Sequence, residues 1–271
     1  MLIPRRSRDP RRRPFPWGVL TPAAAIIVLA APGLLLSACG VLGTRPTTVP
    51  PAAKLYEEGE RLLLDDKPDA AREQFSRLVQ RHPESDLVPV ARFLVGETYY
   101  RSKDYERAVP EFETFVTVYP GHQIADLGQY RLARSYFDQM PTLERDQAIT
   151  GRALGEFRKL IRLYPESRYA PDAIVKIEAC RLRLAQKELW IADFYVRQGK
   201  IEAALPRYDA VLRDYGRTQA APQALYQKAD ALIHLGRTDE AATLLKKLVD
   251  EFPASEWTRR ARERRASAPG A

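Results

Sequence analysis

A motif that recurs five times constrains the fold of this chain more than any other feature. A tyrosine, histidine or phenylalanine precedes a proline, or once a glycine, at positions 82–83, 119–120, 164–165, 215–216 and 252–253. An alanine stands twelve residues before the second position of each motif, and a large apolar or aromatic residue stands eight residues before it. The alanines are Ala71, Ala108, Ala153, Ala204 and Ala241, and the large residues are Phe75, Phe112, Phe157, Tyr208 and Leu245. This self-similarity indicates a repeat protein.

Each repeat resembles a tetratricopeptide repeat, which is a pair of antiparallel helices with small residues where the helices cross. The small residues expected in the first helices are Gly59, Gly96, Ala133, Ala192 and Ala229, which let two backbones approach closely. The predicted fold class is all-α, a right-handed α-solenoid of five tetratricopeptide-type helical hairpins. The predicted repeats span about 54–83, 87–120, 124–165, 171–216 and 221–253.

Two repeats are longer than the others. The third contains eight extra residues around 140–147, where Pro141 and three consecutive charged residues predict a loop. The fourth contains 14 extra residues, and no proline or glycine occurs between Asp172 and Gln198. Fourteen residues are close to four helical turns, so we predict one long helix that keeps its buried face in register, with Cys180 as a structural residue.

The N-terminus has the pattern of a secretory signal peptide over residues 1–38. Six arginines precede an apolar stretch from Val19 to Leu36, and the sequence Leu36-Ser37-Ala38-Cys39 resembles the lipobox of bacterial lipoprotein precursors. This resemblance implies lipidation of Cys39, and Gly40 after it implies an outer-membrane anchor that faces the periplasm. The proline-containing residues 39–53 are then an extended tether. An uncleaved transmembrane helix is the alternative interpretation.

The net charge of +8 belongs to the two ends of the chain. Residues 1–38 contain six arginines and one aspartate, whereas residues 254–271 contain five arginines and two glutamates, so the charges between them balance. The body therefore lacks the continuous basic surface that nucleic acids require. We interpret residues 254–271 as a basic C-terminal tail, and the alternative is that its arginine-rich part is the solvated, frayed end of the last helix.

The sequence offers no grouping of residues that is typical of an enzyme. The three histidines, His82, His122 and His234, have no partners at metal-ligand spacing, and no phosphate-binding or nucleophile motif is found. We therefore expect no enzymatic activity, no metal and no cofactor. A peptidoglycan lytic enzyme with a helical module is the enzymatic alternative, but the 18 residues after position 253 are too few for its catalytic domain.

Several segments resemble the BamD family of outer membrane protein assembly factors. They are 144–147, 153–160, 164–173, 184–188, 194–199, Arg207 and 212–215. The resemblance implies a lipoprotein scaffold that binds unfolded β-barrel precursors, docks on the POTRA region of a BamA-like barrel protein, and works with other assembly lipoproteins. Gly216 departs from the proline usual in that family. Another tetratricopeptide-repeat lipoprotein, such as a secretin pilotin or a cell-envelope coordinator, is the alternative, although these usually keep regular repeat lengths.

Two groups of residues are candidate binding sites. The tetratricopeptide register directs six apolar or aromatic side chains of the first helices into the concave surface, where they would form a groove for the precursor peptide. They are Tyr56, Leu63, Phe93, Tyr100, Tyr130 and Phe137. The alternative is that these rings pack between hairpins as core. Arg207 matches an arginine at which the family docks its barrel partner, although Asp209 or Asp214 could instead be an internal partner for it.

Overall fold

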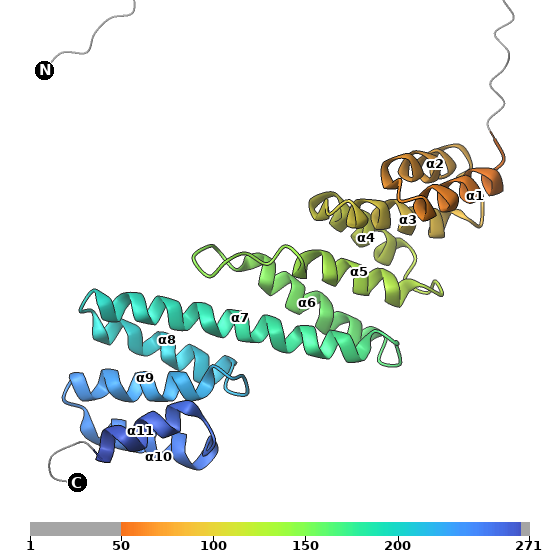
Figure 1. Cartoon of the computed structure of the whole chain (residues 1–271). Coiled ribbons are helices and arrows are strands. Elements are labelled where there is room, and N and C mark those ends of the chain that lie inside the picture. The colour runs from red at the N-terminus through yellow and green to blue at the C-terminus, as the bar shows by residue number, and fades with distance from the viewer. Residues whose placement is uncertain (1–49, 267–271) are drawn as a thin grey trace, which may run out of the picture. The chain divides into compact units, whose positions relative to one another are not determined.

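The computed structural model describes residues 50–266, with side chains as far as residue 263. The chain divides into two units, residues 1–47 and 48–271, and every described residue lies in the second unit. The described part contains eleven helices and no strand (Figure 1). They are α1 Ala52–Leu64, α2 Pro68–Arg81, α3 Val88–Arg101, α4 Tyr105–Val118, α5 Ala125–Phe137, α6 Ala148–Leu163, α7 Ala170–Arg197, α8 Ile201–Asp214, α9 Ala221–His234, α10 Thr238–Glu251 and α11 Glu256–Ala266.

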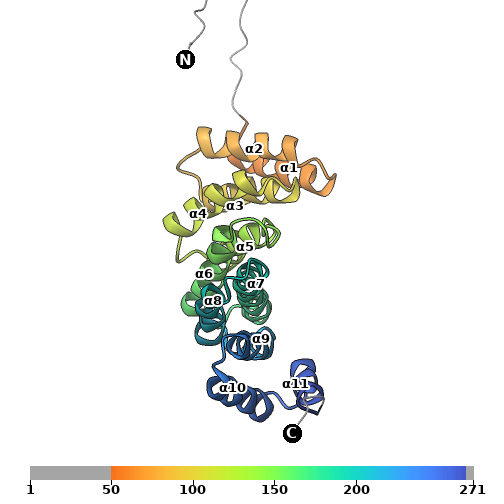
Figure 2. The ribbon, with the colours of Figure 1, turned by 90° about the vertical axis from the view of Figure 1, so that its left-hand side faces the viewer.

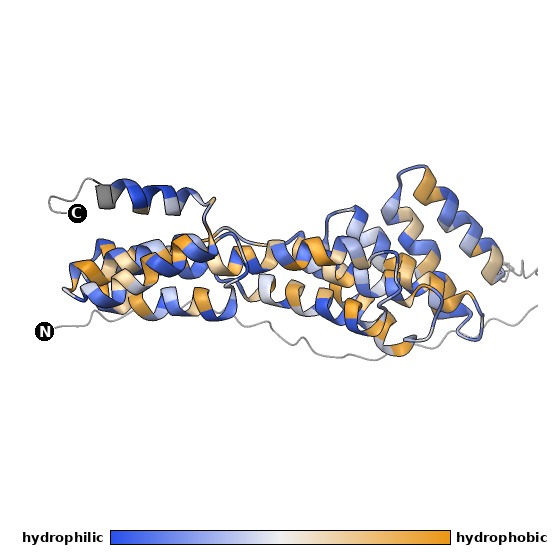
Figure 3. Cartoon of the chain, turned by 90° about the horizontal axis from the view of Figure 1, so that it is seen from below, coloured by the Kyte–Doolittle hydropathy of each residue, from blue (hydrophilic) through white to orange (hydrophobic). Residues whose placement is uncertain are grey.

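Helices α1 to α10 pair in order along the chain as five antiparallel hairpins. Each helix packs against the helix before it and the helix after it, so the hairpins stack one on the next (Figure 2). This arrangement confirms the predicted all-α solenoid of five hairpins. The helices carry both apolar and hydrophilic residues (Figure 3), and the buried apolar residues lie between the packed helices.

A small residue meets a large ring where the two helices of a hairpin cross. The five alanines of the second helices, Ala71, Ala108, Ala153, Ala204 and Ala241, are all at most 1% exposed. A Cβ atom added to Gly59 would lie 2.5 Å from Cε1 of Phe75, and one added to Gly96 would lie 2.8 Å from Cε1 of Phe112. These distances leave no room for a methyl group, so glycine is required at both positions for the rings to pack.

The turn within a hairpin is closed by a residue in the left-handed region. Asp66 and Lys103 have φ of 56° and 59°, and Gly199 and Gly236 have φ of 70° and 78° at the corresponding positions of the fourth and fifth hairpins. This conformation satisfies the last carbonyl groups of the first helix before the second helix begins. The third hairpin has the predicted loop instead, which connects α5 to α6 through residues 138–147.

The fourth hairpin contains the predicted long helix. α7 has 28 residues, from Ala170 to Arg197, and Cys180 lies within it at 0% exposure. Its first half packs with the third hairpin, and its second half packs with α8 and α9. The extra turns therefore shift the fourth hairpin along the stack while the apolar register is kept.

The basic C-terminal segment differs from the prediction. Residues 256–266 form a separate helix, α11, and do not continue α10, which ends at Glu251. Trp257 packs against Tyr226 of α9 with ring centroids 5.4 Å apart, and the hydroxyl of Thr258 donates to the carbonyl oxygen of Phe252 at 2.6 Å. The arginine-rich composition gave no sign of this attachment, which among the described side chains includes Trp257, Thr258 and Ala261.

Replacing Ala241 by leucine tests the crossings. Leucine would overpack the site where α10 crosses α9, with an expected loss of about 1–3 kcal/mol in the free energy of unfolding. Ala242→Leu is the matched control, because Ala242 is the next residue of the same helix and is exposed. Urea denaturation measures both variants, and an equal loss for the two would contradict the assignment of Ala241 to the crossing.

Candidate protein-binding faces

The first helices of the middle hairpins line one side of the stack. Helix α3 contacts α5 directly, and α5 contacts α7, whereas each second helix packs mainly on first helices. All six side chains predicted to form a peptide groove lie on α1, α3 and α5. We call the side formed by α1, α3, α5 and the first half of α7 the inner face.

The six groove residues divide into two groups by burial. Leu63, Phe93 and Tyr130 are buried, at 5–8% exposure. The ring of Phe93, for example, lies 5.6 Å from the rings of both Phe112 and Phe115. These three side chains pack mainly within and between hairpins.

The other three groove residues, Tyr56, Tyr100 and Phe137, are half-buried and present part of their surface to solvent. Tyr100 and Phe137 share one apolar cluster, whereas Tyr56 belongs to the cluster of the first hairpin. Tyr100 and Phe137 therefore border the same cluster, whereas Tyr56 borders a different one.

A ladder of polar contacts crosses the inner face. The hydroxyl of Tyr100 in α3 donates to Asp138 at 2.5 Å, and the hydroxyl of Tyr130 in α5 donates to Asp172 in α7 at 2.7 Å. Arg134 lies between them and donates to the hydroxyl of Tyr130 at 3.2 Å and to Asp138 at 3.4 Å. Burial, together with the hydrogen bonds to the two aspartates, raises the pKa of both tyrosines, so they remain neutral donors.

A partly buried ion pair extends this ladder. Arg131 in α5 donates from Nε to Glu97 in α3 at 2.7 Å and from Nη2 at 3.1 Å, and the side chain of Glu97 is 9% exposed. A two-pronged contact of this kind fixes the direction of both side chains. The ion pair therefore helps to fix the position of the second hairpin relative to the third.

Sequence reasoning missed the carboxylates of the ladder. Asp138 pairs with a residue 38 positions earlier, and Asp172 with one 42 positions earlier, so both contacts join different hairpins. The repeat pattern describes contacts within a hairpin and gives no signal for these. Arg134 stands four residues after Tyr130, which places both side chains on the same face of one helix. This spacing could have been used to predict the contact between them.

The two insertions contact each other. Nζ of Lys187, in the extra turns of α7, donates to the carbonyl oxygen of Leu143 at 2.6 Å and of Glu144 at 3.4 Å, both in loop 138–147. Cys180 lies in the same apolar cluster as Met140 of this loop, and burial raises the pKa of its thiol to about 11. Cys180 is thus a packing residue, and the lysine holds the loop on the long helix.

Arg207 lies in the middle of α8 rather than near its start, so an argument from the helix dipole does not apply to it. Its Nη1 donates to Glu188 of α7 at 3.2 Å, and the side chain is 41% exposed. The two internal partners considered from the sequence pair elsewhere, Asp209 with Lys228 and Asp214 with Arg213. Arg207 therefore has one internal partner and an accessible side.

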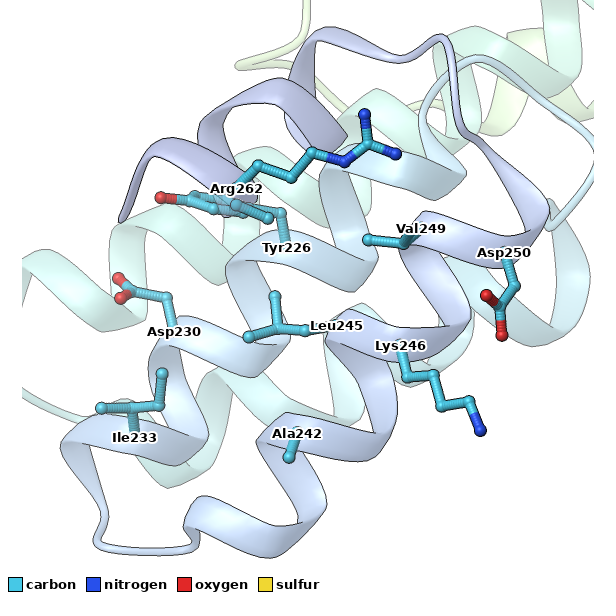
Figure 4. A pocket seen from close by; sticks show the side chains of 10 residues that line it. Tyr226, Asp230, Ile233, Ala242, Leu245, Lys246, Val249, Asp250 and Arg262 are labelled. Carbon is cyan, nitrogen blue, oxygen red and sulfur yellow. The ribbon is translucent and has the colours of Figure 1, made fainter. Parts of the chain in front are cut away.

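A groove remains at the end of the stack, where α11 covers only part of the last hairpin. Its volume is about 730 Å³, and its lining includes Tyr226, Leu245 and Val249 with Arg262 at the rim (Figure 4). In each earlier hairpin the corresponding face of the second helix packs against the next first helix. α11 is thus an incomplete substitute for a sixth hairpin.

Some expectations fall on residues that the structure leaves undescribed. Cys39, the signal peptide of residues 1–38 and most of the tether lie outside residues 50–266. In the described part, no helix combines the length and apolar composition needed to cross a membrane. No cluster of three His, Cys, Asp or Glu side chains suited to a metal ion occurs there.

Comparison with protein families gives one match that covers most of the chain. The model of the YfiO family, described as an outer membrane lipoprotein, matches residues 50–246. This range includes all of the first four hairpins and most of the fifth, and it ends before α11.

Individual relatives agree with this match. The outer membrane protein assembly factor BamD of Caulobacter vibrioides is 30% identical over 237 residues, which cover 86% of this chain and 76% of that protein. BamD of Rickettsia prowazekii is 30% identical over 234 residues, which cover 86% and 92% of the two chains. A solved thermophilic TPR protein from Thermus thermophilus is 18% identical, with a TM-score of 0.36 and coverage of 79% of this chain and 98% of that chain.

Proposed function

This chain belongs to the YfiO family of outer membrane lipoproteins, and we propose that it is a scaffold that binds unfolded β-barrel precursors and docks on a barrel-forming partner. Its relatives are outer membrane protein assembly factors, which supports a role in assembly rather than in catalysis. The observation that carries the proposal is the likeness to BamD over 86% of the chain.

The proposed anchor is a lipid on Cys39. The thiol would receive a diacylglyceryl group, and residues 1–38 would then be removed, which leaves the hairpins in the periplasm below the outer membrane. Two or more acyl chains hold a protein stably on a bilayer without a transmembrane helix.

Mass spectrometry of the N-terminal peptide from purified membranes tests the anchor. We expect a peptide that begins at Cys39 with acyl groups attached, and Cys39→Ser should prevent processing. An unmodified Cys39 that is still joined to residues 1–38 would contradict the proposed location.

The proposed site for the precursor is the inner face, at the half-buried members of the predicted groove. Tyr100 and Phe137 belong to one cluster, and the ring of Phe137 has Nζ of Lys176 4.9 Å from its centroid. Leu63, Phe93 and Tyr130, which are buried, would pack beneath the exposed rings and hold them in place. Ring contacts recognise an aromatic residue of the precursor without requiring a fixed sequence, which suits a relay for many clients.

A double variant, Tyr100→Ala with Phe137→Ala, tests this site. We expect the dissociation constant for a C-terminal peptide of a barrel precursor to rise roughly two- to tenfold for each ring removed. Val118→Ala with Leu163→Ala is the control, because these exposed apolar residues end the second helices α4 and α6. Fluorescence anisotropy measures binding on variants whose circular dichroism is unchanged, and unchanged affinity would contradict the proposed site.

The proposed docking contact is Arg207 with a carboxylate on the POTRA region of a BamA-like partner. The Arg207 side chain is 41% exposed and uses one nitrogen for Glu188, so other donors remain for a second carboxylate. Other assembly lipoproteins would join the same complex. Arginine suits this role because its planar fork binds carboxylates at two points.

Arg207→Glu tests the docking contact. We expect the variant to lose co-purification of the barrel partner, because two carboxylates would repel, and an acid-to-base change on the partner should restore it. Glu188→Gln is the matched control, since it removes the negative charge of the internal partner and keeps the docking charge of Arg207. Equal loss in both variants would mean that the pair is structural, and no loss in Arg207→Glu would remove Arg207 from the interface.

A further inference from the structure

The first half of α7 has no second helix of its own. α7 contains 28 residues, whereas α8, with which it pairs, contains 14. Nη2 of Arg181 donates to the carbonyl oxygen of Asp214, the last residue of α8, at 3.3 Å, so α8 ends beside the middle of α7. The part of α7 that precedes Arg181 therefore extends beyond α8 (Figure 1).

Two adjacent apolar residues are exposed on this part of α7. Ile174 and Val175 are 55% and 62% exposed, and no other large apolar side chains that are exposed in the described part of the chain are neighbours in sequence. We call these two residues the α7 ledge. Ala173 and Ile177, on another side of the same turns, pack with the third hairpin. The first half of α7 is thus attached to the third hairpin and carries the ledge on a different side.

The α7 ledge lies on the side of the helix that is buried farther along. Ile174 precedes Ala192 by 18 residues, which is five turns, and Val175 precedes Leu189 by 14 residues, which is close to four turns. Ala192 and Leu189 are 0% and 3% exposed, because they pack in one cluster with residues of α8 and α9. The ledge therefore lies where a second helix would cover α7, and among the described residues it is open.

The α7 ledge also continues the line along which α7 contacts α8. Ile174, Arg181 and Glu188 are spaced by seven residues, which is close to two turns, so they follow one another along nearly the same side of α7. α8 meets this line at Glu188, through Arg207, and at Arg181, through the carbonyl oxygen of Asp214. Ile174 is the next position on the line, beyond the end of α8.

The separation between the ledge and Arg207 suits a single interface. The 14 residues from Ile174 to Glu188, the partner of Arg207, span about 21 Å of helix at a rise of about 1.5 Å per residue. A stable interface covers roughly 800 Å² of each protein, a patch roughly 30 Å across, so one partner can contact both places. Such interfaces have an apolar centre and a polar rim. Arg207 offers a charge, and the ledge offers apolar surface next to it.

We propose that the α7 ledge is the apolar part of the docking site for the barrel-forming partner, so that Ile174 and Val175 are buried by the same POTRA region that pairs with Arg207. This inference rests on the proposed function and adds to it the contact that a single exposed charge does not supply. Burial of apolar side chains acts mainly on the rate of dissociation, whereas a charge at the rim acts mainly on the rate of association and on its dependence on salt.

Binding kinetics of the mature, lipidated chain in detergent with the purified full-length barrel partner test the ledge. Ile174→Gln with Val175→Gln should raise the dissociation constant about five- to thirtyfold, through faster dissociation and to the same extent at low and high salt. Glutamine keeps the helix propensity of these positions. Leu64→Gln with Val118→Gln is the matched control, because these residues are exposed and apolar but lie on α1 and α4, and we expect it to bind as the wild type does.

Photochemical cross-linking identifies what covers the ledge in intact membranes. The photoreactive residue p-benzoylphenylalanine in place of Val175 should form a cross-link to the POTRA region of the barrel partner. The same residue in place of Val118 is the control and should form none. A cross-link from position 175 to another protein or to lipid, or no cross-link at all, would overturn the proposal.

Failure of this inference is distinguishable from failure of the proposed function. If Arg207→Glu weakens binding and the ledge variant binds as tightly as the wild type, the inference is wrong and the docking contact stands. If the ledge variant binds weakly and Arg207→Glu has no effect, the ledge is supported and Arg207 is removed from the interface. If the wild-type chain does not bind the barrel partner, both are wrong.

Discussion

The close approach of two helices at a small residue is the constraint on which the rest of the structure depends. Phe75 and Phe112 occupy the space that side chains at Gly59 and Gly96 would fill, and the alanine of each second helix is buried beside them. The two helices of a hairpin can therefore pack closely at this point, and each hairpin packs against the next. Because the second helix of every hairpin has this buried alanine, the stack keeps its core where insertions lengthen the third and fourth hairpins.

The two insertions provide what the regular repeats do not. Loop 138–147 and the extra turns of α7 are held together by Lys187, so neither is an independent appendage. Next to them, the pair Arg207–Glu188 joins α7 to α8, and the polar ladder from Tyr100 to Asp172 joins the hairpins on the inner face. Charged side chains that could bind partners are therefore concentrated around the third and fourth hairpins.

The sequence predicted the parts of the structure that repeat. The hairpins, the buried alanines, the long α7 and the loop near Met140 follow from periodic positions whose environment is the same in each repeat. Contacts between hairpins were not predictable in this way, because Glu97, Asp138 and Asp172 each find partners on another hairpin through geometry that the repeat does not encode. The groove prediction treated Phe93 as open to the concave surface, but its ring packs against the rings of Phe112 and Phe115 in its own hairpin. Helix α11 was missed because its arginines outnumber the few residues that attach it.

We propose that this stack of hairpins serves outer membrane protein assembly by holding a barrel-forming partner. Affinity purification of the lipidated chain from its own membranes, followed by identification of the proteins that come with it, is the decisive measurement for this role. We expect recovery of a large barrel protein with POTRA domains in amounts comparable to the bait. Recovery of a secretin without such a barrel protein would contradict it and would favour a pilotin.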